Sequence, residues 1–533
     1  MEQIKIGWGS REISTKAPVN IPGQFHMRIS RGILDPLTVT ALVLDGDGDQ
    51  AIFVSGDMVV CRDHLLDELR GEMLARDPGF PAEKLLMNAT HAHTGASHYN
   101  DGFGGEETNP TGISTPPAST VPHDGVEIAS GREYRRFLVK QAADAVEEAW
   151  RGRKAGGVAW GYGYAVVAHS RRVVYFDDLS ERPGAIKNST HGVNGHAAMY
   201  GNTNDPMFSH YEAGADHFIN LLFTFNGNDE LTGAVVNIPC PSQNSEMIEM
   251  LSADYWHNVR EAIRAKYGNI FILPQCAAAG DLSPRILHYK KAQERRFKLK
   301  YGLSEDTGLN NREECTQGAS PEHDQIGNTA MCERRDIAER VAWAFDEVFA
   351  WAKKDIRREI PVRHSVSTIF LDRRIISDEE YADAVKELEK MEKLPWKTEG
   401  TPRERLHDNS ILEAGRNRLR GIITRYEEQK TEKTIPMELH VIRVGDIAFA
   451  TNRFELYMDY QHRIQARSPF EQTFIVQLTA QPGTAGGSYL CTERGAWGRG
   501  YSASMFCNQV NPDGGQQIVE ATLEKLGELA EED

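Results

Sequence analysis

The chain has 533 residues, of which 40% are hydrophobic and 26% charged, a composition that is ordinary for a folded globular protein. Its formal net charge of −17 argues against a nucleic-acid partner, because binding to a phosphate backbone depends on clustered lysine and arginine. No apolar run approaches the roughly 20 residues that span a bilayer, so we expect no membrane span.

The cysteines and the N-terminal residues favour a cytoplasmic location. The seven cysteines are scattered and form no CxxC pair, which fits reduced thiols better than a disulfide framework. Residues 1–9 contain no apolar segment followed by a cleavage site, so no secretory signal is expected. The expected partner is a small-molecule substrate, and the sequence leaves homo-oligomerisation open.

The first half of the chain alternates between predicted strands and predicted helices. Apolar runs with strand spacing are separated by stretches with helical periodicity and by turn residues. We expect strands at residues 39–44, 51–55, 85–88, 218–225, 233–238 and 269–273, and helices at 61–74, 135–151 and 255–266. The acidic run at 45–49 resembles a calcium loop, but Gln50 replaces the required glycine, so a hairpin turn is expected.

The second half continues the pattern with more charged helices. We expect helices at 335–354, 378–393, 411–429 and 513–529, and strands at 362–371, 437–450 and 474–478. Residues 290–335 are polar and aperiodic, which suggests a surface excursion. With no repeat or linker to divide it, the chain reads as one domain, 1–533. The alternation predicts an α/β fold with a layered mixed β-sheet core and flanking helices.

His91 and His93 directly follow the predicted strand at 85–88. In layered α/β proteins ligands collect at the carboxyl ends of strands, and alternate residues of an extended segment point to the same side. Both imidazoles could therefore face one pocket, as ligands of a zinc-like ion or as an acid and base. The alternative is a pair of surface histidines in a polar loop.

Three further features are weaker when taken alone. Ser283 lies in a G-D-L-S-P turn after the strand at 269–273, where it could be a nucleophile if activated or an ordinary turn residue. Glu455 follows a strand and could complete a metal site or simply begin a helix. Tyr489 and Tyr501 flank a glycine-rich stretch, and aromatic packing is the alternative reading for both.

In this order, the motifs resemble those of the catalytic domain of the neutral/alkaline (non-lysosomal) ceramidase family. Residues 6–14 resemble the family's opening strand, S-G-D-M at 55–58 its "D-[LM]" strand end, and A-T-H-A-H-T-G at 89–95 its "ATHTHSG". G-D-L-S-P at 280–284 resembles "GDVSP". Tyr489 and Tyr501 match the tyrosines of "Y-I-T-T … Y-E", with Ser502 in place of the glutamate. The order and spacing hold from near residue 4 to near residue 530.

The resemblance implies a zinc ion held by two histidines, a glutamate and a tyrosine, with a serine that takes part in amide hydrolysis. By matching position, His91 is the first histidine ligand, Glu455 the carboxylate and Tyr489 the tyrosine. His93 would act as acid and base or orient the substrate. Ser283 would be the nucleophile or would hold the metal-bound water.

Three more residues complete the expected catalytic set. Arg171 falls where the family has an arginine in "N-R-S" that can steady a developing oxyanion, although a surface arginine is an equal alternative. Asp281 and Tyr501 belong to two of the matched motifs.

The second histidine ligand of the family has no counterpart here. The family carries it in "V-N-x-x-x-H-P", whereas residues 236–243 read V-N-I-P-C-P-S-Q. Cys240 falls closest and could bind zinc as a thiolate, although a buried cysteine packed as a small hydrophobe is the commoner state. His257 is a rival ligand, and His210 and His217 are weaker ones. The expected cofactor is thus a divalent metal, Zn²⁺ first, with another ion or none as alternatives.

The expected function is metal-dependent hydrolysis of an amide (N-acyl) bond in a soluble substrate. Family members that act on ceramide are typically exported and carry an additional β-sandwich domain; no signal, such domain or bilayer-docking segment is apparent here. A carbohydrate-active hydrolase, either a glycosidase or a carbohydrate esterase, is an alternative, with Asp57, Asp254, Asp281 and Glu455 as available carboxylates. A non-catalytic relative that kept the pocket is a third.

Overall fold

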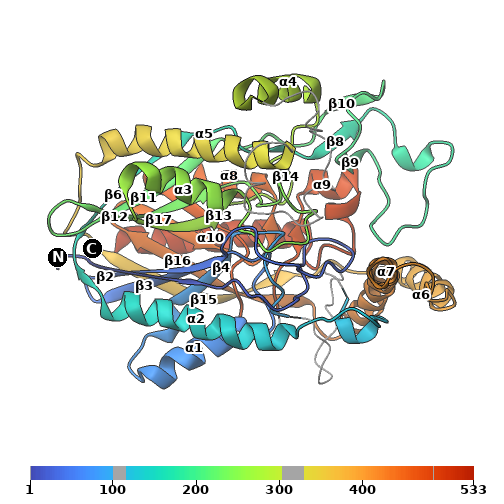
Figure 1. Cartoon of the computed structure of the whole chain (residues 1–533), viewed down its shortest axis with the longest axis horizontal. Helices are drawn as coiled ribbons and strands as arrows, with labels where there is room; N and C mark the ends of the chain where they lie inside the picture. Colours follow the sequence, from blue (N-terminus) through green and yellow to red (C-terminus); the bar gives the residue numbers. More distant parts are fainter. Residues whose placement is uncertain (1, 100–115, 303–328, 484, 533) are drawn as a thin grey trace.

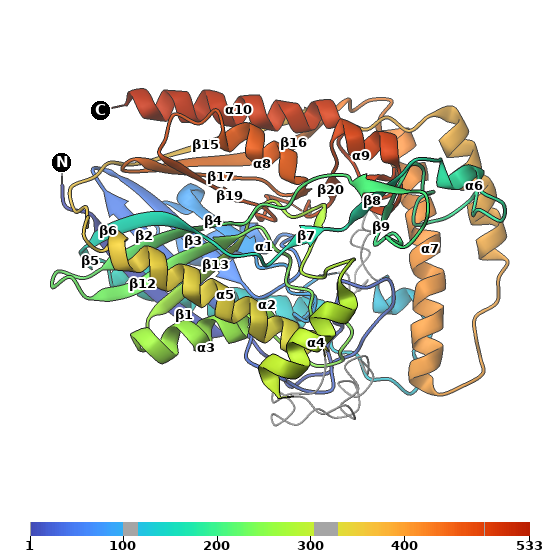
Figure 2. The same ribbon diagram turned by 90° about the horizontal axis from the view of Figure 1, so that it is seen from above.

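The computed structural model describes residues 2–99, 116–302, 329–483 and 485–532. Three sheets of four or five strands pack around a shared apolar core, and helices cover their outer faces (Figure 1, Figure 2). The predicted α/β fold with a layered mixed-sheet core and flanking helices is confirmed.

The first sheet contains the strand that leads to the two histidines. Its order is β4-β3-β2-β1-β5, with β3 and β4 parallel and the other pairs antiparallel. Asp47 (φ 55°) and Gly48 (φ 86°) form the predicted hairpin turn between β2 and β3. The elements are β1 (Lys5–Glu12), β2 (Thr38–Gly46), β3 (Asp49–Gly56), β4 (Leu85–Ala89), β5 (Lys154–Ala155), α1 (Leu65–Arg76) and α2 (Gly131–Arg151).

The second sheet has the order β13-β12-β11-β6, and α3 makes the crossover between the parallel strands β12 and β13. Helices α3 and α5 lie side by side over its outer face (Figure 1). The elements are β6 (Gly157–Tyr164), β11 (Phe218–Phe225), β12 (Leu231–Ile238), β13 (Phe271–Cys276), α3 (Tyr255–Tyr267) and α5 (Thr329–Ala352).

The third sheet, of order β15-β16-β17-β19, is covered by α10 and α8 (Figure 2). The predicted strand at 437–450 is two strands, because Gly445 (φ 61°) turns the chain between β16 and β17. The elements are β15 (Val362–Asp372), β16 (Thr434–Val444), β17 (Ile447–Thr451), β19 (Gln472–Val476), α8 (Met458–Gln465) and α10 (Pro512–Glu531).

Side chains from all three sheets meet in one core, which fixes the sheets relative to one another. Its aromatic members include Trp8, Phe53, Phe449 and Phe474. Each such buried side chain contributes on the order of 2 kcal/mol through the hydrophobic effect. The sheets therefore form a rigid frame whose strand ends can position side chains accurately.

Short elements connect the frame to a pair of long helices, α6 (Asp378–Glu392) and α7 (Pro402–Glu428), that stand at one end of the molecule (Figure 1). Both helices begin with a capping box, at Ser377 with Glu380 and at Thr401 with Glu404. The short strands and helix are β7 (His169–Ser170), β8 (Arg172–Tyr175), β9 (Ala197–Met199), β10 (Phe208–Tyr211), β14 (Leu282–Ser283), β18 (Glu455–Leu456), β20 (Tyr489–Leu490) and α9 (Glu493–Gly498). Single 3₁₀ turns occur at Ala82–Lys84, Ala118–Thr120, Leu179–Glu181 and Tyr501–Ala503.

The segment expected as an aperiodic excursion, 290–335, is partly helical. Helix α4 (Lys290–Tyr301) buries Phe297 and Tyr301 against Cys332, and α5 begins at Thr329. The prediction missed α4 because its charges surround the helix and leave no clear apolar stripe. Residues 303–328 of this segment, including Cys315, lie outside the described residues.

Two expectations about cysteines and membranes can be compared with the described residues. Six of the seven cysteines lie there, and all six are buried and free of disulfide bonds. Among the described helices, none combines the length and apolarity that crossing a membrane requires.

Candidate functional site

His91 lies just past β4 in a backbone conformation that few residues adopt. Its φ of 61° is left-handed, which costs energy for a residue with a side chain. Its Nδ1 lies 2.7 Å from the Val59 carbonyl oxygen and donates a hydrogen bond to it. Its Nε2 faces His93 and Glu455, and the ring is buried.

His93 presents its Nε2 to the same point. The two Nε2 atoms are 3.3 Å apart, and the rings are nearly perpendicular. His93 Nδ1 lies 3.2 Å from a carboxylate oxygen of Glu246. Burial lowers the pKa of His93, so the ring is neutral near pH 7. Gly23 (φ 104°) packs directly on this ring, where any Cβ would lie 2.7 Å from it.

Glu246 is itself held by Arg285, whose Nη1 lies 2.6 Å from its other carboxylate oxygen. Burial alone would raise the pKa of Glu246, but Arg285 and His93 lower it to about 2. The carboxylate is therefore ionised at neutral pH and lies close to His93 Nδ1, which makes no hydrogen bond within the described part of the chain.

Glu455 and Tyr489 come together because β18 and β20 pair in parallel, with these two residues opposite each other. A Glu455 carboxylate oxygen lies 3.2 Å from His91 Nε2. Burial raises the pKa of Glu455, yet His91 and Arg171 outweigh this and lower it. Burial also raises the pKa of Tyr489 well above its ordinary value, so its hydroxyl keeps its proton.

The glycine of the G-D-L-S-P turn explains how this turn reaches the site. A Cβ at Gly280 would lie 2.3 Å from the Glu455 carbonyl oxygen, so only glycine fits. The Gly280 carbonyl oxygen accepts a 2.9 Å hydrogen bond from Arg171 Nη2. The same nitrogen lies 3.1 Å from the Tyr489 hydroxyl and 3.7 Å from the Glu455 carboxylate.

Ser283 lies behind this group and is fully buried. Its Oγ accepts a hydrogen bond from the Arg285 amide and lies 3.4 Å from the Tyr200 hydroxyl and 3.5 Å from Gln243 Nε2. Tyr200 in turn contacts Arg171 at 3.4 Å. Ser283 thus connects to the site through Tyr200 and Arg171, and these partners of its Oγ include no histidine or carboxylate.

The Asp281 carboxylate is not free, because it is engaged in a hydrogen bond that holds the local structure. Its Oδ1 accepts a 2.9 Å hydrogen bond from the Met458 amide at the start of α8, and its carbonyl oxygen accepts one from the Arg171 amide. Burial raises the pKa of Asp281 to about 7. Asp281 therefore positions Arg171 and α8, and it shows no direct contact with His91 or Glu455.

A small pocket opens in front of these groups, with a volume of about 60 Å³. Tyr501 lines it, with its ring edge-on to Tyr489 at 5.6 Å. Its lining residues are Gly23, Val59, Val60, Arg62, His91, His93, Tyr99, Glu455, Leu478, Gly487, Tyr489 and Tyr501. The predicted residues His91, His93, Glu455, Tyr489 and Tyr501 share this pocket.

The two residues proposed to replace the family's second histidine do not line the pocket. Cys240 Sγ lies 3.3 Å from the Val167 carbonyl oxygen, and burial raises its thiol pKa well above the ordinary value. Cys240 is therefore a protonated thiol that packs elsewhere. His257 lies on α3, and neither it nor His210 or His217 belongs to the pocket lining.

The carboxylates that a carbohydrate-active enzyme would need are mostly engaged elsewhere. Asp57 forms a bidentate ion pair with Arg260, at 2.9 and 3.0 Å. Asp254 accepts hydrogen bonds from Ser245 and from the Tyr255 amide at the start of α3. Of the four candidates, Glu455 alone faces the small pocket, so no pair of opposed carboxylates supports that alternative.

As the side chains stand, the described part of the chain contains no group of three or more His, Cys, Asp or Glu side chains arranged to hold a metal ion. The donor atoms nevertheless have the chemistry of a cation site. His91 Nε2 lies 3.3 Å from His93 Nε2 and 3.2 Å from the Glu455 carboxylate, so two imidazole nitrogens and a carboxylate, which are common ligands of divalent cations, lie close together. The hydrogen bond from His91 Nδ1 to the Val59 carbonyl oxygen is of the kind that metal-binding histidines make.

Four residues of this network were not predicted from the sequence: Tyr200, Gln243, Glu246 and Arg285. A signal existed for Glu246. The rule that ligands collect at the carboxyl ends of strands points to the residues after Ile238, and Glu246 is the first carboxylate there. Tyr200 and Arg285 come from loops whose course depends on long-range packing.

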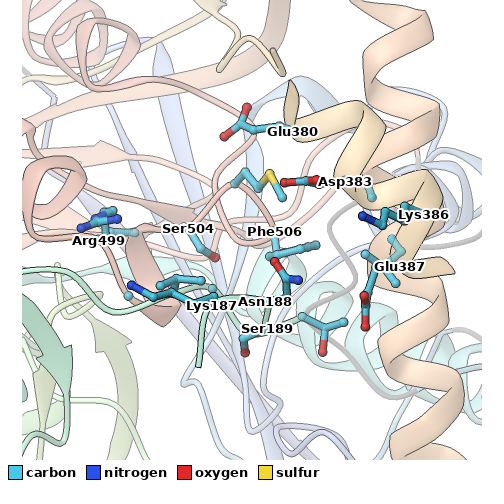
Figure 3. Close-up of a pocket in the computed structure, with 18 of the residues that line it drawn as sticks. Lys187, Asn188, Ser189, Glu380, Asp383, Lys386, Glu387, Arg499, Ser504 and Phe506 are labelled. Carbon is cyan, nitrogen blue, oxygen red and sulfur yellow. The ribbon is translucent and has the colours of Figure 1, made fainter. Parts of the chain in front are cut away.

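A second, larger cavity lies beside α6, with a volume of about 310 Å³ (Figure 3). Figure 3 shows side chains of α6 facing the loop that carries Lys187, Asn188 and Ser189. Its charged lining residues are Lys187, Arg374, Glu380, Asp383, Lys386, Glu387, Lys390 and Arg499. The five basic and three acidic groups make it a polar cavity with a basic excess.

The rings of Phe25, His191 and Tyr501 pack together near residues that line both cavities. Phe25 packs against Tyr501 at 5.3 Å and against His191 at 4.5 Å between ring centroids. Tyr501 lines the small pocket, whereas Thr190 and Ser504, close along the chain to His191 and Tyr501, line the larger cavity. The two cavities are therefore neighbours.

No protein-family model matches the chain, and no curated protein matches it by sequence. A crystal structure of neutral ceramidase from Pseudomonas aeruginosa matches with a TM-score of 0.61 and 15% identity, over 100% of this chain and 75% of that one. A ceramidase complexed with C2 matches with a TM-score of 0.61 and 13% identity, over 100% and 76%. The chain therefore has a ceramidase-like fold, as the motifs indicated.

Proposed function

We propose that this chain is a hydrolase that cleaves an amide (N-acyl) bond in a polar, soluble substrate, with a divalent cation in the small pocket. The observation that carries the proposal is the meeting of His91, Glu455 and Tyr489 from three distant segments at one pocket, with Arg171 in contact with Tyr489. The similarity to ceramidase structures supports hydrolysis of an amide bond as the reaction class.

The cation, proposed to be Zn²⁺, would be held by His91 and Glu455 with Tyr489 nearby, and would supply polarisation of the scissile carbonyl and of a water molecule. The protein's own part is to stabilise the negative charge that develops on the carbonyl oxygen. Tyr489 keeps its hydroxyl proton, and the buried Arg171 supports it at 3.1 Å. Preorganised donors of this kind act strongly in a site that excludes water.

Ser283 is assigned a positioning role. Its hydrogen-bond partners offer no general base, and a serine hydroxyl is a weak nucleophile without one. Through Tyr200 it steadies Arg171. Water is therefore the proposed nucleophile.

The larger cavity beside α6 supports a polar substrate. Most of its basic groups have acidic partners, such as Arg374 with Glu380 and Lys390 with Glu387. Within the described residues Lys386 forms no ion pair, so it is available to an anionic group. An N-acyl compound with a carboxylate could place its amide in the small pocket and its anionic end here. Six buried free thiols in the described residues favour a reducing, cytoplasmic setting for this reaction.

The test is a panel of soluble N-acyl amines and N-acyl amino acids, with free amine as the readout. The wild-type chain, His91→Ala and Ser283→Ala are assayed with and without added Zn²⁺. We expect amine release by the wild type that is abolished in His91→Ala and reduced in Ser283→Ala. Activity that both substitutions leave untouched would refute the assignment of the pocket.

A further inference from the structure

We propose that a third cavity binds an oxyanion group, a carboxylate or a phosphate, through the guanidinium groups of Arg62 and Arg453. This arginine cavity has a volume of about 460 Å³. Its lining includes residues from the loops before α1, β18 and α10 and from β15, β16 and α7. Anion binding in this cavity is independent of the reaction proposed above.

Arg453 is a buried cation without a carboxylate partner in the described part of the chain. It is 3% exposed, and its guanidinium makes one hydrogen bond to the described residues, from Nη2 to Gln509 Oε1 at 2.6 Å. Its Nε is buried and has no partner there. Because a guanidinium carries five N–H donors, most of the donors of Arg453 are unused. A buried charge without a counter-charge is unfavourable, so an anion that reaches Arg453 relieves this cost.

Arg62 brings a second guanidinium to the same cavity. It is 6% exposed, and its Nε lies 3.3 Å from Asp63 Oδ1. This is the one side-chain hydrogen bond that Arg62 makes to the described residues, so its two Nη atoms have no acceptor among them. The Tyr99 ring packs 4.9 Å from its Cζ, and a Cβ at Gly486 would lie 2.5 Å from the Arg62 Cβ. Close packing therefore holds Arg62 in this position.

Gln509 adds a neutral donor beside the two arginines. Because its Oε1 accepts the hydrogen bond from Arg453, its Nε2 is left as a donor, and this atom makes no hydrogen bond to the described residues. Gln509 also lines the cavity. The unused groups of Arg62, Arg453 and Gln509 are thus all donors. Carboxylate and phosphate oxygens accept such hydrogen bonds, and guanidinium groups match them in shape and charge.

The carboxylates that line the arginine cavity already have cationic partners. Glu428 and Glu432 contact Arg373 at 3.0 and 2.5 Å, and Glu438 contacts Arg70 at 2.8 Å. Their negative charges are therefore balanced locally. The free positive charge of the cavity lies at the two arginines described above, and this is the end at which an anion binds.

The arginine cavity and the small pocket are neighbours. Arg62 lines both of them, and the adjacent residues Gly486 and Gly487 line one each. An oxyanion held by Arg62 thus lies next to the proposed place of amide cleavage. It belongs either to a free ion or to a second acidic group of the substrate, and competition experiments separate these two sources.

The experiment is equilibrium dialysis of the full chain against radiolabelled inorganic phosphate at constant ionic strength. The wild type is compared with Arg62→Gln, Arg453→Gln and Arg453→Lys, which keeps the charge but loses the planar fork. The matched control is Arg136→Gln, which removes an exposed arginine on α2. Circular dichroism verifies that each variant is folded.

We expect the wild type and Arg136→Gln to bind one equivalent of phosphate with saturation. Affinity should fall about tenfold to a hundredfold in Arg62→Gln and in Arg453→Gln, as for the loss of hydrogen bonds between charged groups, and less in Arg453→Lys. Absence of saturable binding in the wild type would overturn the site, since water alone would then solvate both arginines. Equal affinity in all folded variants would overturn it as well.

The source of the oxyanion is tested by competition with the labelled phosphate. An N-acyl dicarboxylic amino acid is compared with an N-acyl amine that has no carboxylate. Displacement by the acidic compound alone assigns the site to an acidic group of the substrate, and phosphate binding that neither compound changes assigns it to a free ion. Displacement by the uncharged compound as well would show that the cavity does not select an oxyanion, and would contradict the proposal.

Discussion

The small pocket and the cavity beside α6 are neighbours built in opposite ways. The key polar side chains of the small pocket, His91, Glu455 and Tyr489, are buried and lie at or just after strands, where hydrogen bonds and strand pairing hold them. The α6 cavity is lined by exposed, charged side chains such as Lys386 and Asp383 on a helix and by a facing loop (Figure 3). Rigid frames suit chemistry and adaptable surfaces suit recognition, so we assign bond cleavage to the first and substrate selection to the second.

The largest effect is expected from Glu455→Gln in the small pocket. It removes a charge but preserves shape, and we expect kcat/KM for an N-acyl substrate to fall at least ~1,000-fold, or ~4 kcal/mol. Steady-state amine release measures this, with the exposed Glu471→Gln as the matched control. A fall of less than tenfold in kcat/KM would show that the amide bond is not cleaved in the small pocket.

Asp281→Asn tests how much burial of the Asp281 carboxylate destabilises the folded state when this group is ionised. The pKa of Asp281 is raised from 3.8 to about 7 by burial, so the folded state holds a proton that the unfolded state releases. Its contribution to stability is therefore full below pH 4 and is lost as the pH rises to 7, a change of ~4 kcal/mol at most. Asparagine mimics the protonated acid.

Urea unfolding of the wild type and Asp281→Asn across pH 4 to 8 provides the measurement. The stability difference should be near zero at pH 4 and should grow in favour of the variant up to pH 7. A difference that stays constant with pH would show that Asp281 does not titrate in this range.

Arg171→Lys separates the chemical role of the guanidinium from its charge. Lysine cannot reach Gly280, Tyr489 and Tyr200 together as the planar group does. We expect kcat to fall about 100-fold with a small change in KM, as for the loss of an oxyanion donor. The neighbouring Arg172→Lys, which faces Glu212, should change stability and leave kcat near the wild-type value.

Ser283→Ala tests whether water or the Ser283 hydroxyl is the nucleophile. Because Ser283 acts through Tyr200, we expect a loss of about tenfold in kcat, close to ~1.4 kcal/mol. Rapid-quench kinetics of the wild type should show no acyl-enzyme burst. A burst together with a loss near 10,000-fold would make Ser283 the nucleophile after all.

The smallest effect is expected in the α6 cavity. Lys386→Glu should raise KM for an anionic N-acyl substrate by about threefold to tenfold and leave kcat unchanged, since exposed charges interact weakly. The exposed Lys140→Glu on α2 is the control. The effect should shrink with added salt. Equal KM values for both variants would show that the α6 cavity does not contribute to substrate binding.

The frame was largely predictable because its periodicity is local. The strand predicted at 218–225 is β11 with the same bounds, and the helix predicted at 255–266 is α3 to within one residue. Helix α4 escaped prediction because its charged residues leave no apolar stripe, and the start of α7 lies nine residues before the predicted one for the same reason.

Within the site, the residues of sequence motifs were predictable, and those fixed only by packing were not. His91, His93, Glu455 and Tyr489 each follow or occupy a strand, so their convergence could be inferred. The direction of Cys240 could not be, because Pro239 and Pro241 take the chain out of strand alternation directly after β12. Glu246 reaches His93 only through the irregular loop that follows.

The most direct test of the account is the structure of the Glu455→Gln chain, in which turnover should be slowest, in complex with its best N-acyl substrate. We predict that the scissile carbonyl lies in the small pocket among His91, Tyr489 and position 455, with the anionic end of the substrate beside Lys386. A substrate bound wholly in the α6 cavity, or with its amide away from His91 and position 455, would contradict the division of labour between the two regions.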